Sequence, residues 1–201
     1  MYTSLILALL FGVDVSNYDA NHDFGKSGAA FGIAKATEGT GHDDRSFARH
    51  WREMSEKKIV RGAYHYGHPK NDPIAEADHF LKVVQAQGLG KGDLLALDLE
   101  TTDGRSEEQV NTWARRWLEH VEAKTGVKAL FYSSWSFAGQ YGDGLQDYPL
   151  WVAHYGKKKG TVEPPGDWKE WTIHQYASGK GGDENVSRLN AEQLRALGYQ
   201  G

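Results

Sequence analysis

The sequence predicts an α/β protein folded as an irregular TIM-like β/α barrel, and three observations lead to this expectation. Apolar or alternating runs typical of strands recur about eight times along the chain. In the first half, amphipathic helical stretches separate these runs, and regular alternation of strand and helix favours a parallel sheet. After Lys128 the helices fade, so we expect βα units first and a more purely β return. A doubly wound open sheet is the alternative.

The expected strands are short runs in which apolar residues occupy every position or every second position. In a closed β/α barrel such strands pair in order around the axis, and the last strand pairs with the first. The runs are Phe11–Ser16, Ala29–Lys35, Ile59–Tyr66, Leu94–Glu100, Lys128–Ser133, Leu150–His154, Thr172–Ala177 and Asn185–Leu189.

The expected helices are clearest in the first half of the chain. Asp72 precedes Pro73, which suits a helix N-cap followed by proline at the first helical position. Ser106 and Gln109 have the spacing of a capping box, and Gly126 is placed to end the same helix. The three helices are expected at Arg45–Lys58, Pro73–Gln87 and Ser106–Lys124.

The composition narrows the classes of function. The chain has 201 residues, of which 39% are hydrophobic, and this suits a single domain with a full-sized core. Its net charge of -4 argues against a nucleic-acid partner, because such proteins usually carry a basic excess on one face. The chain contains no cysteine, so it has no disulfide, no thiolate nucleophile and no cysteine-ligated metal.

The apolar segment Leu5–Phe11 is too short to cross a bilayer, since a spanning helix needs ~20 residues. It also lacks the basic start and the small-residue cleavage site of a signal peptide. We therefore expect no stable membrane association, and we interpret the segment as a buried lead-in to the first strand.

The segment Leu94–Glu100 holds the strongest candidate for chemistry. Four apolar residues lead into Asp98 and Glu100, which lie two apart and therefore face the same side of a strand. In a β/α barrel the strand ends line the mouth, where active sites of this fold lie. Two neighbouring acids repel, so one keeps a proton while the other ionises, as glycoside hydrolysis requires. A solvated strand end is the alternative, and Asp103 beyond the motif is expected to matter little.

Two further acids lie near strand ends. Asp14 lies toward the end of the first strand, and Asp183 precedes the last. Because the first and last strands of a closed barrel are neighbours, these two carboxylates are expected to meet. A simple charged turn is the alternative for Asp183.

Polar and aromatic residues mark the other strand ends. Together with the acids they resemble a saccharide groove, in which rings stack on sugar faces. Taken singly, each aromatic is better explained by core packing. The candidates for substrate binding are Lys35, Tyr64, Tyr132, Trp151 and Gln175.

A metal site is not expected. His65 and His68 have an i, i+3 spacing, but they fall at a strand end, and no His-Glu-x-x-His motif occurs. We expect no cofactor either.

Six short motifs in one order carry a family resemblance. They are Gly-Val-Asp-Val-Ser, Ile-Ala-Lys-Ala-Thr-Glu-Gly, Gly-Ala-Tyr-His-Tyr, Leu-Asp-Leu-Glu, Leu-Trp-Val-Ala-His-Tyr and His-Gln-Tyr. This string resembles glycoside hydrolase family 25, the Chalaropsis-type lysozymes of bacteria, fungi and phages, from about Gly12 to Asn190.

The resemblance implies an irregular β/α barrel that hydrolyses the β-1,4 bond between N-acetylmuramic acid and N-acetylglucosamine in peptidoglycan. It assigns Glu100 as the general acid, Asp98 as its stabilising partner, and Asp14 and Asp183 as further acids of the site. Ser187 replaces the aromatic or apolar residue commoner in the family, which leaves the choice between Asp183 and Glu184 open.

The resemblance also shapes the expected organisation and setting. We expect a single catalytic domain spanning residues 1–201, with a core of about 11–198 and without a separate wall-binding domain. The partner is the glycan strand of peptidoglycan, and the protein is expected to be a monomer acting at the bacterial cell wall, either secreted or released as a phage endolysin. The competing functions are a catalytically silent wall-binding barrel and a metal-dependent sugar deacetylase.

Overall fold

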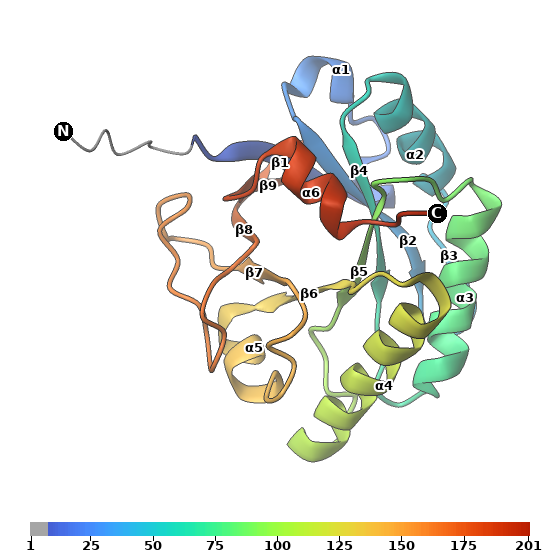
Figure 1. The fold of residues 1–201 in the computed structure, drawn as a ribbon, viewed down its shortest axis with the longest axis vertical. Helices are drawn as coiled ribbons and strands as arrows, with labels where there is room; N and C mark the ends of the chain where they lie inside the picture. Colours follow the sequence, from blue (N-terminus) through green and yellow to red (C-terminus); the bar gives the residue numbers. More distant parts are fainter. Residues whose placement is uncertain (1–7) are drawn as a thin grey trace.

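The structure, a computed structural model, describes residues 8–201, and its strands form a closed barrel (Figure 1). β1 pairs with β2 and with β9, which closes the ring, and β3 is attached to the outside of β2. The barrel prediction is therefore confirmed, and the open-sheet alternative is wrong. The strands are β1 (Leu10–Val15), β2 (Phe31–Glu38), β3 (His42–Asp43), β4 (Val60–Tyr66), β5 (Leu94–Asp98), β6 (Leu130–Ser134), β7 (Leu150–Ala153), β8 (Ile173–Gly179) and β9 (Gly182–Ser187).

The barrel is irregular in its last strand. Within the ring, which leaves out β3, neighbouring strands from β1 to β8 pair in parallel. β9 runs antiparallel to both β8 and β1. A tight hairpin at Lys180–Gly181 joins β8 to β9, so no helix is needed between them. The strand begins at Gly182 rather than at Asn185, the predicted start. This hairpin is the β return that the fading helices predicted.

Long helices cover the first half of the barrel only. Figure 1 shows α2, α3 and α4 side by side along one flank, whereas loops and the short α5 lie along the other. The predicted caps of α3 and α4 are present: Asp72 accepts the N–H of Ile74, and Ser106 forms a capping box with Gln109. The helices are η1 (Asn17–Asp19), α1 (Phe24–Ser27), α2 (Phe47–Glu56), α3 (Pro73–Ala86), α4 (Glu107–Thr125), α5 (Trp135–Tyr141) and α6 (Ala191–Leu197).

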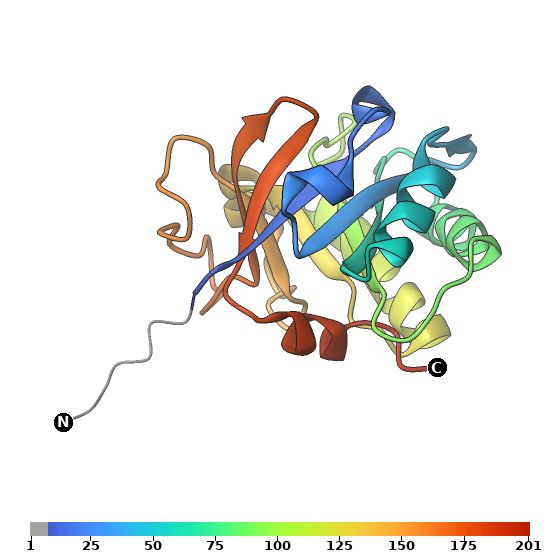
Figure 2. The same ribbon diagram turned by 90° about the horizontal axis from the view of Figure 1, so that it is seen from above.

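The core has two layers, as alternation along the strands requires. Strand side chains that point outward, including Leu95 and Leu97, pack beneath the helices with helix residues such as Trp117 of α4. Side chains that point inward fill the barrel, including Phe31, Leu94 and Trp151. α6 covers one end of the barrel through Leu194, which is 0% exposed. Figure 2 shows α6 in dark red beneath the strands and the β8–β9 hairpin at the opposite end, so the mouth lies away from α6.

The amino-terminal segment differs from its predicted role where it can be followed. Residues 5–7 of the apolar run lie outside the described residues, and Leu9 is exposed rather than buried. Within residues 8–201, no helix combines the length and the apolar character needed to cross a membrane.

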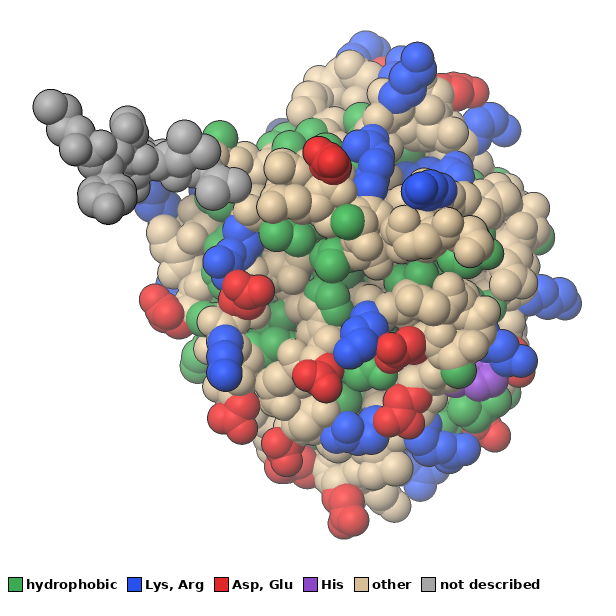
Figure 3. Space-filling view, in the orientation of Figure 1, with side chains coloured by type: hydrophobic (Ala, Val, Ile, Leu, Met, Phe, Trp, Pro, Cys, Tyr) green, Lys and Arg blue, Asp and Glu red, His purple; other side chains and the backbone are tan. Residues whose placement is uncertain are grey.

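On the face covered by α6, Lys and Arg side chains are interspersed with Asp and Glu (Figure 3), so this face carries no continuous basic surface.

Candidate active site

Three acids meet at the mouth of the barrel because three strands deliver them there. Asp14 lies near the end of β1, Asp98 ends β5, and Asp183 lies near the start of the antiparallel β9. Asp14 and Asp183 are direct partners in the β1–β9 register. The expectation that these two residues meet across the closed barrel is therefore confirmed.

Asp14 is a buried carboxylate held by two amides. Its Oδ2 atom accepts hydrogen bonds from Gln175 Nε2 at 2.8 Å and from Asn185 Nδ2 at 2.7 Å. Burial raises the pKa of Asp14 to about 7, and the nearby charge of Asp183 adds to this, while the two amide hydrogen bonds lower it. Asp14 therefore exchanges a proton near neutral pH.

Asp98 and Glu100 form a coupled pair. Asp98 is 6% exposed, and its Oδ1 has no hydrogen-bond partner among the described residues. Glu100 lies just beyond β5 and is exposed toward the mouth. The two carboxyl groups influence each other, since each contributes to the pKa shift of the other. Because β5 ends at Asp98 and Glu100 lies beyond it, the shared strand face of the two acids stays a prediction.

The environment of this pair favours retention of a proton. Burial raises the pKa of Asp98 well above its ordinary value, and repulsion from Glu100 raises it further. Desolvation by the surrounding protein also raises the pKa of Glu100, although the residue as a whole is exposed, and the charge of Asp183 contributes. The positive charge of Lys35 opposes both shifts. The pair can therefore hold one proton and one negative charge together.

A buried network below the mouth fixes these acids. Gln175 accepts hydrogen bonds from Tyr132 and Tyr155 at 2.8 and 2.9 Å while donating to Asp14. Trp151 donates from Nε1 to Asn185 Oδ1 at 2.8 Å, and Asn185 in turn donates to Asp14.

This network changes the position expected for Trp151, which was proposed as a sugar platform. Its side chain is 1% exposed and packs inside the barrel, 4.4 Å from the ring of Tyr132 between centroids. In this structure Trp151 therefore supports the amide that holds Asp14. Tyr64 is also buried and contacts Trp151 edge to face. Lys35 lies at the mouth, paired with Glu38 at 2.6 Å.

The two acidic residues of β9, Asp183 and Glu184, have different hydrogen-bond partners. Asp183 Oδ2 accepts a hydrogen bond from Tyr155 at 3.2 Å, and its charge reaches Asp14 and Glu100. Glu184 instead accepts from Tyr176 at 2.7 Å. The geometry thus favours Asp183 over Glu184 as the acid of the mouth.

Two adjoining cavities flank Glu100. One, of about 320 Å³, is lined by Trp135, His154 and Tyr155, and the other, of about 400 Å³, extends toward Tyr141. Both reach Glu100, Ser134 and Ser136, so they form one groove past the acid. Trp135 is 40% exposed and Tyr155 is 50% exposed, which makes their rings accessible to a sugar face.

Trp135 was missed by the sequence analysis, because it begins the short α5 and has no strand-end signature. Its Nε1 donates to the carbonyl of Glu163 at 2.8 Å, which fixes the ring. Ser134 is the N-cap of this helix, and its place immediately after the β6 run is the signal that could have indicated a helix and a groove residue there.

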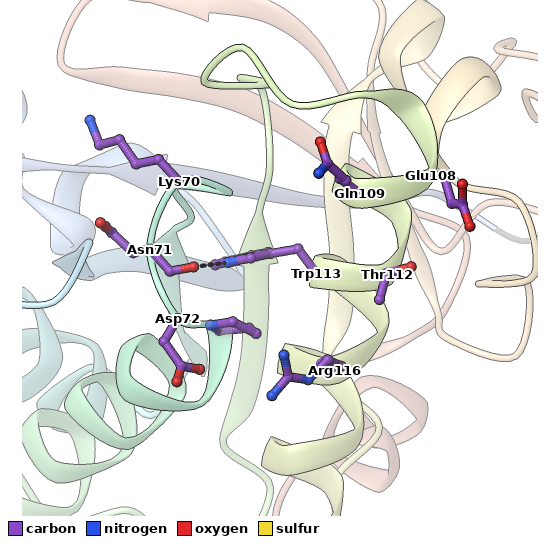
Figure 4. A pocket seen from close by; sticks show the side chains of 9 residues that line it. Lys70, Asn71, Asp72, Glu108, Gln109, Thr112, Trp113 and Arg116 are labelled. Carbon is purple, nitrogen blue, oxygen red and sulfur yellow. Dashed lines mark hydrogen bonds between the residues drawn. The ribbon is translucent and has the colours of Figure 1, made fainter.

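A larger cavity of about 640 Å³ lies apart from the acids (Figure 4). It opens between the beginnings of α3 and α4, and Trp113 lies across it with Nε1 donating to the carbonyl of Asn71 at 3.0 Å. Its charged groups are mixed in sign, with Lys70 and Arg116 beside Asp72 and Glu108. None of the acids of the mouth lines this cavity, so its size does not make it the reaction site.

The histidines near the mouth are engaged by protein groups. His65 contacts Thr37 and Glu76, and His68 contacts Glu38 and Asp103. Across the described residues, no group of three or more His, Asp or Glu side chains is arranged to hold a metal ion.

Comparison with known protein families identifies the family of this chain. The model of the family described as "Glycosyl hydrolases family 25" matches residues 13–183, which include all four acids. This chain belongs to glycosyl hydrolase family 25. As a member of the family it is an enzyme, and the resemblance inferred from the six motifs is confirmed.

Individual family 25 relatives cover nearly the whole chain. The N,O-diacetylmuramidase of Arthroderma benhamiae is 32% identical over 210 residues, covering 94% of this chain and 87% of that protein. The N,O-diacetylmuramidase of Chalaropsis sp is 31% identical and covers 92% and 97%. The solved structure of a family GH25 lysozyme from Aspergillus fumigatus superposes with a TM-score of 0.84 at 29% identity, covering 96% and 100%.

Proposed function

We propose that this family 25 enzyme is a lysozyme of the N-acetylmuramidase type, which hydrolyses β-1,4 bonds between N-acetylmuramic acid and N-acetylglucosamine in peptidoglycan. The observation that carries the proposal is the coupled Asp98–Glu100 pair at the base of a groove with exposed aromatic rings. The muramidase names of relatives that match nearly the whole chain support the choice of substrate.

Glu100 is the general acid. It is exposed to the groove, where a glycosidic oxygen can reach it, and its raised pKa keeps a proton available. Asp98 is buried beneath it with one oxygen atom that lacks a hydrogen-bond partner. An unpaired buried acceptor is costly, and a substrate N–H group can satisfy it. Asp14 and Asp183 are further acids beside the pair. Gln175, which accepts a hydrogen bond from Tyr132, donates one to Asp14 and keeps it in place.

The closeness of the pair indicates how the bond is broken. Enzymes with two independent carboxylates place them about 5–5.5 Å apart for retention and about 6.5–9.5 Å apart for inversion. Asp98 and Glu100 instead come from one strand end, two residues apart in sequence, and the charge of Glu100 acts on Asp98. This favours the substrate-assisted route, in which the 2-acetamido oxygen of the sugar attacks its own anomeric carbon. Asp98 then receives the acetamido N–H, while Glu100 protonates the leaving oxygen and later activates water.

The setting follows from the substrate. The enzyme acts on glycan strands at the bacterial cell wall, and it works as a monomer with one catalytic unit. The walls of the groove come from a single chain, so a partner subunit is not needed to complete it.

Product analysis tests both the bond and the stereochemistry. Digestion of purified cell walls followed by borohydride reduction is expected to yield muramitol, since cleavage frees the reducing end of N-acetylmuramic acid. Proton NMR during the first turnovers should show the β-anomer, because attack by the acetamido group and then by water inverts the carbon twice. Glucosaminitol would contradict the bond choice, and an initial α-anomer would contradict the acetamido route.

Substitution of the acid tests its role. Glu100→Gln is expected to lower wall lysis by about 10²-fold or more, the usual loss when a general acid is removed, and Asp98→Asn should be comparably harmful. Glu108→Gln, on the outer helix α4, serves as the control. Near-parental turbidity loss by a Glu100→Gln protein with unchanged circular dichroism would rule the assignment out.

A further inference from the structure

A line of polar contacts, in which carboxylates alternate with nitrogen groups, leads from the β5–α4 loop to the acid pair. Asp103 Oδ2 lies 3.1 Å from His68 Nδ1, and His68 Nε2 lies 3.1 Å from Glu38 Oε1. Glu38 Oε2 lies 2.6 Å from Lys35 Nζ. Carboxylates and nitrogen groups therefore alternate along the line. The side chains of His68 and Asp103 are 19% and 13% exposed, so solvent screens these contacts less than it would at an open surface.

Both ring nitrogens of His68 have a carboxylate neighbour. A neutral imidazole has one N–H group, whereas the imidazolium ion has two. Both ring nitrogens of His68 face carboxylate oxygens, which only accept hydrogen bonds when ionised. Two other groups face this residue: Glu76 on α3 accepts its backbone N–H at 3.1 Å, and the ring of Tyr66 lies 5.3 Å away. Glu76 thereby anchors the backbone at His68.

Asp103 also has contacts that a solvated loop residue would lack. It accepts from Thr101 Oγ1 at 3.3 Å and adopts a φ of 47°, a left-handed conformation that few residues other than glycine adopt. The backbone is thus held where it presents this carboxylate to His68. The expectation that Asp103 matters little took no account of these contacts.

The other end of the line reaches the acid pair. Tyr66 is the register partner of Asp98 between β4 and β5, and Lys35 Nζ lies 5.0 Å from the centre of the Tyr66 ring. The ammonium group is therefore held over the tyrosine that adjoins Asp98. Its charge acts on both Asp98 and Glu100, although no hydrogen bond joins it to either acid among the described contacts.

We propose that Asp103, His68 and Glu38 form a positioning chain that holds the Lys35 ammonium beside Asp98 and Glu100 and thereby sets the pH range in which the enzyme works. These are positioning residues, because they act through Lys35 and do not touch the reacting atoms. The proposal rests on the proposed function of the acid pair. It also assigns Lys35 an electrostatic role in place of the substrate-binding role expected from the sequence.

The direction of the effect follows from the sign of the charge. Lys35 lowers the pKa of both Asp98 and Glu100. Without His68, Glu38 is tied only to Lys35, and the pair can turn together toward solvent. Both acids then bind protons more tightly. The acidic limb and the basic limb of the activity profile should therefore both move to higher pH.

The experiment compares pH profiles of kcat/KM on soluble peptidoglycan fragments for the parent, His68→Gln, Asp103→Asn and Lys35→Met. All three variants are expected to shift both limbs upward by roughly half a pH unit or more. Lys35→Arg should restore the parental profile, because it keeps the charge. The double variant of His68→Gln and Lys35→Met should shift no further than Lys35→Met alone, since both remove the same charge from the pair.

His120→Gln is the matched control, because His120 also pairs with a carboxylate, Asp78, but between the outer helices α4 and α3. Its profile should coincide with that of the parent. A uniform fall in activity at every pH for His68→Gln and Asp103→Asn would indicate a structural role and overturn the proposal, as would additive shifts in the double variant. If His68→Gln does not fold, Asp103→Asn decides. An inactive parent would refute the proposed function instead, whereas an active parent with unshifted variants refutes only the positioning chain.

Discussion

Asp14 illustrates how a single residue of the site opposes stability. Its carboxylate is buried, and the two amides that donate to it do not offset the loss of hydration, so its pKa rises from 3.8 to about 7. The folded protein consequently binds this proton more tightly than the unfolded chain does. Below pH 4 the group is neutral in both states and costs nothing. As the pH rises toward 7, ionisation becomes favourable only in the unfolded chain, and stability falls.

Asp14→Asn should remove this cost. The amide oxygen can replace Oδ2 as the acceptor for Gln175 and Asn185, and the side chain no longer ionises. We expect the variant to exceed the parent in unfolding free energy by at most about 4 kcal/mol above pH 7, with the difference vanishing near pH 4. Urea denaturation across pH 4–8 measures this difference in unfolding free energy. The control is Asp167→Asn, at an exposed position. A difference independent of pH would contradict this explanation.

At the scale of elements, the short helix α6 does more than its length suggests. An isolated helix of this size is unstable in water, but its capping box, Asn190 with Gln193, and its buried Leu194 hold it against the barrel. It closes the end opposite the acids, where the strand beginnings would otherwise expose the inner apolar layer. β9 both closes the sheet and places Asp183 and Asn185 at the mouth.

Leu194→Ala tests the closing role of α6. Removing a fully buried leucine side chain should lower the unfolding free energy by about 2–5 kcal/mol, because apolar contact is lost and a cavity remains. The control is Glu192→Ala, at an exposed neighbouring position, and it should change the unfolding free energy little. Lysis measured well below the melting temperature should be preserved in both. Loss of activity in a folded Leu194→Ala protein would show that the two ends of the barrel are coupled.

At the scale of the whole molecule, the proposed chemistry relies on acids that converge from separate strands. Proton transfer and charge stabilisation are both available from Asp98 and Glu100. The described residues also offer no cluster of side chains suited to a metal ion. In the proposed mechanism these two acids supply both functions.

Treatment with EDTA should accordingly leave wall lysis unchanged. The comparison is made at matched ionic strength, because chelator salts alone screen charges in the groove. Parallel samples receive EDTA saturated with zinc as the control, because this complex cannot remove zinc from the protein. Activity that disappears with EDTA and returns with zinc would favour the metal-dependent deacetylase instead.

The sequence by itself determined the barrel, the family and the candidate acids. Alternation along strands, amphipathic helices and motifs such as Leu-Asp-Leu-Glu are local patterns, and each records which side of an element is buried. Local patterns therefore placed Asp14, Asp98 and Glu100 at strand ends. They also indicated that Asp14 and Asp183 meet, because closure of the sheet makes the first and last strands neighbours.

Only the tertiary structure decided the residues that support those acids. Trp151 has the same strand-end signature as a groove residue, yet closure of the barrel buries it against Asn185. α5 and α6 are too short for a clear helical period, and their packing stabilises them. The contact of His68 with Asp103 joins two loops 35 residues apart in sequence. Such contacts depend on how distant segments meet in space, and a pattern within one segment does not contain that information.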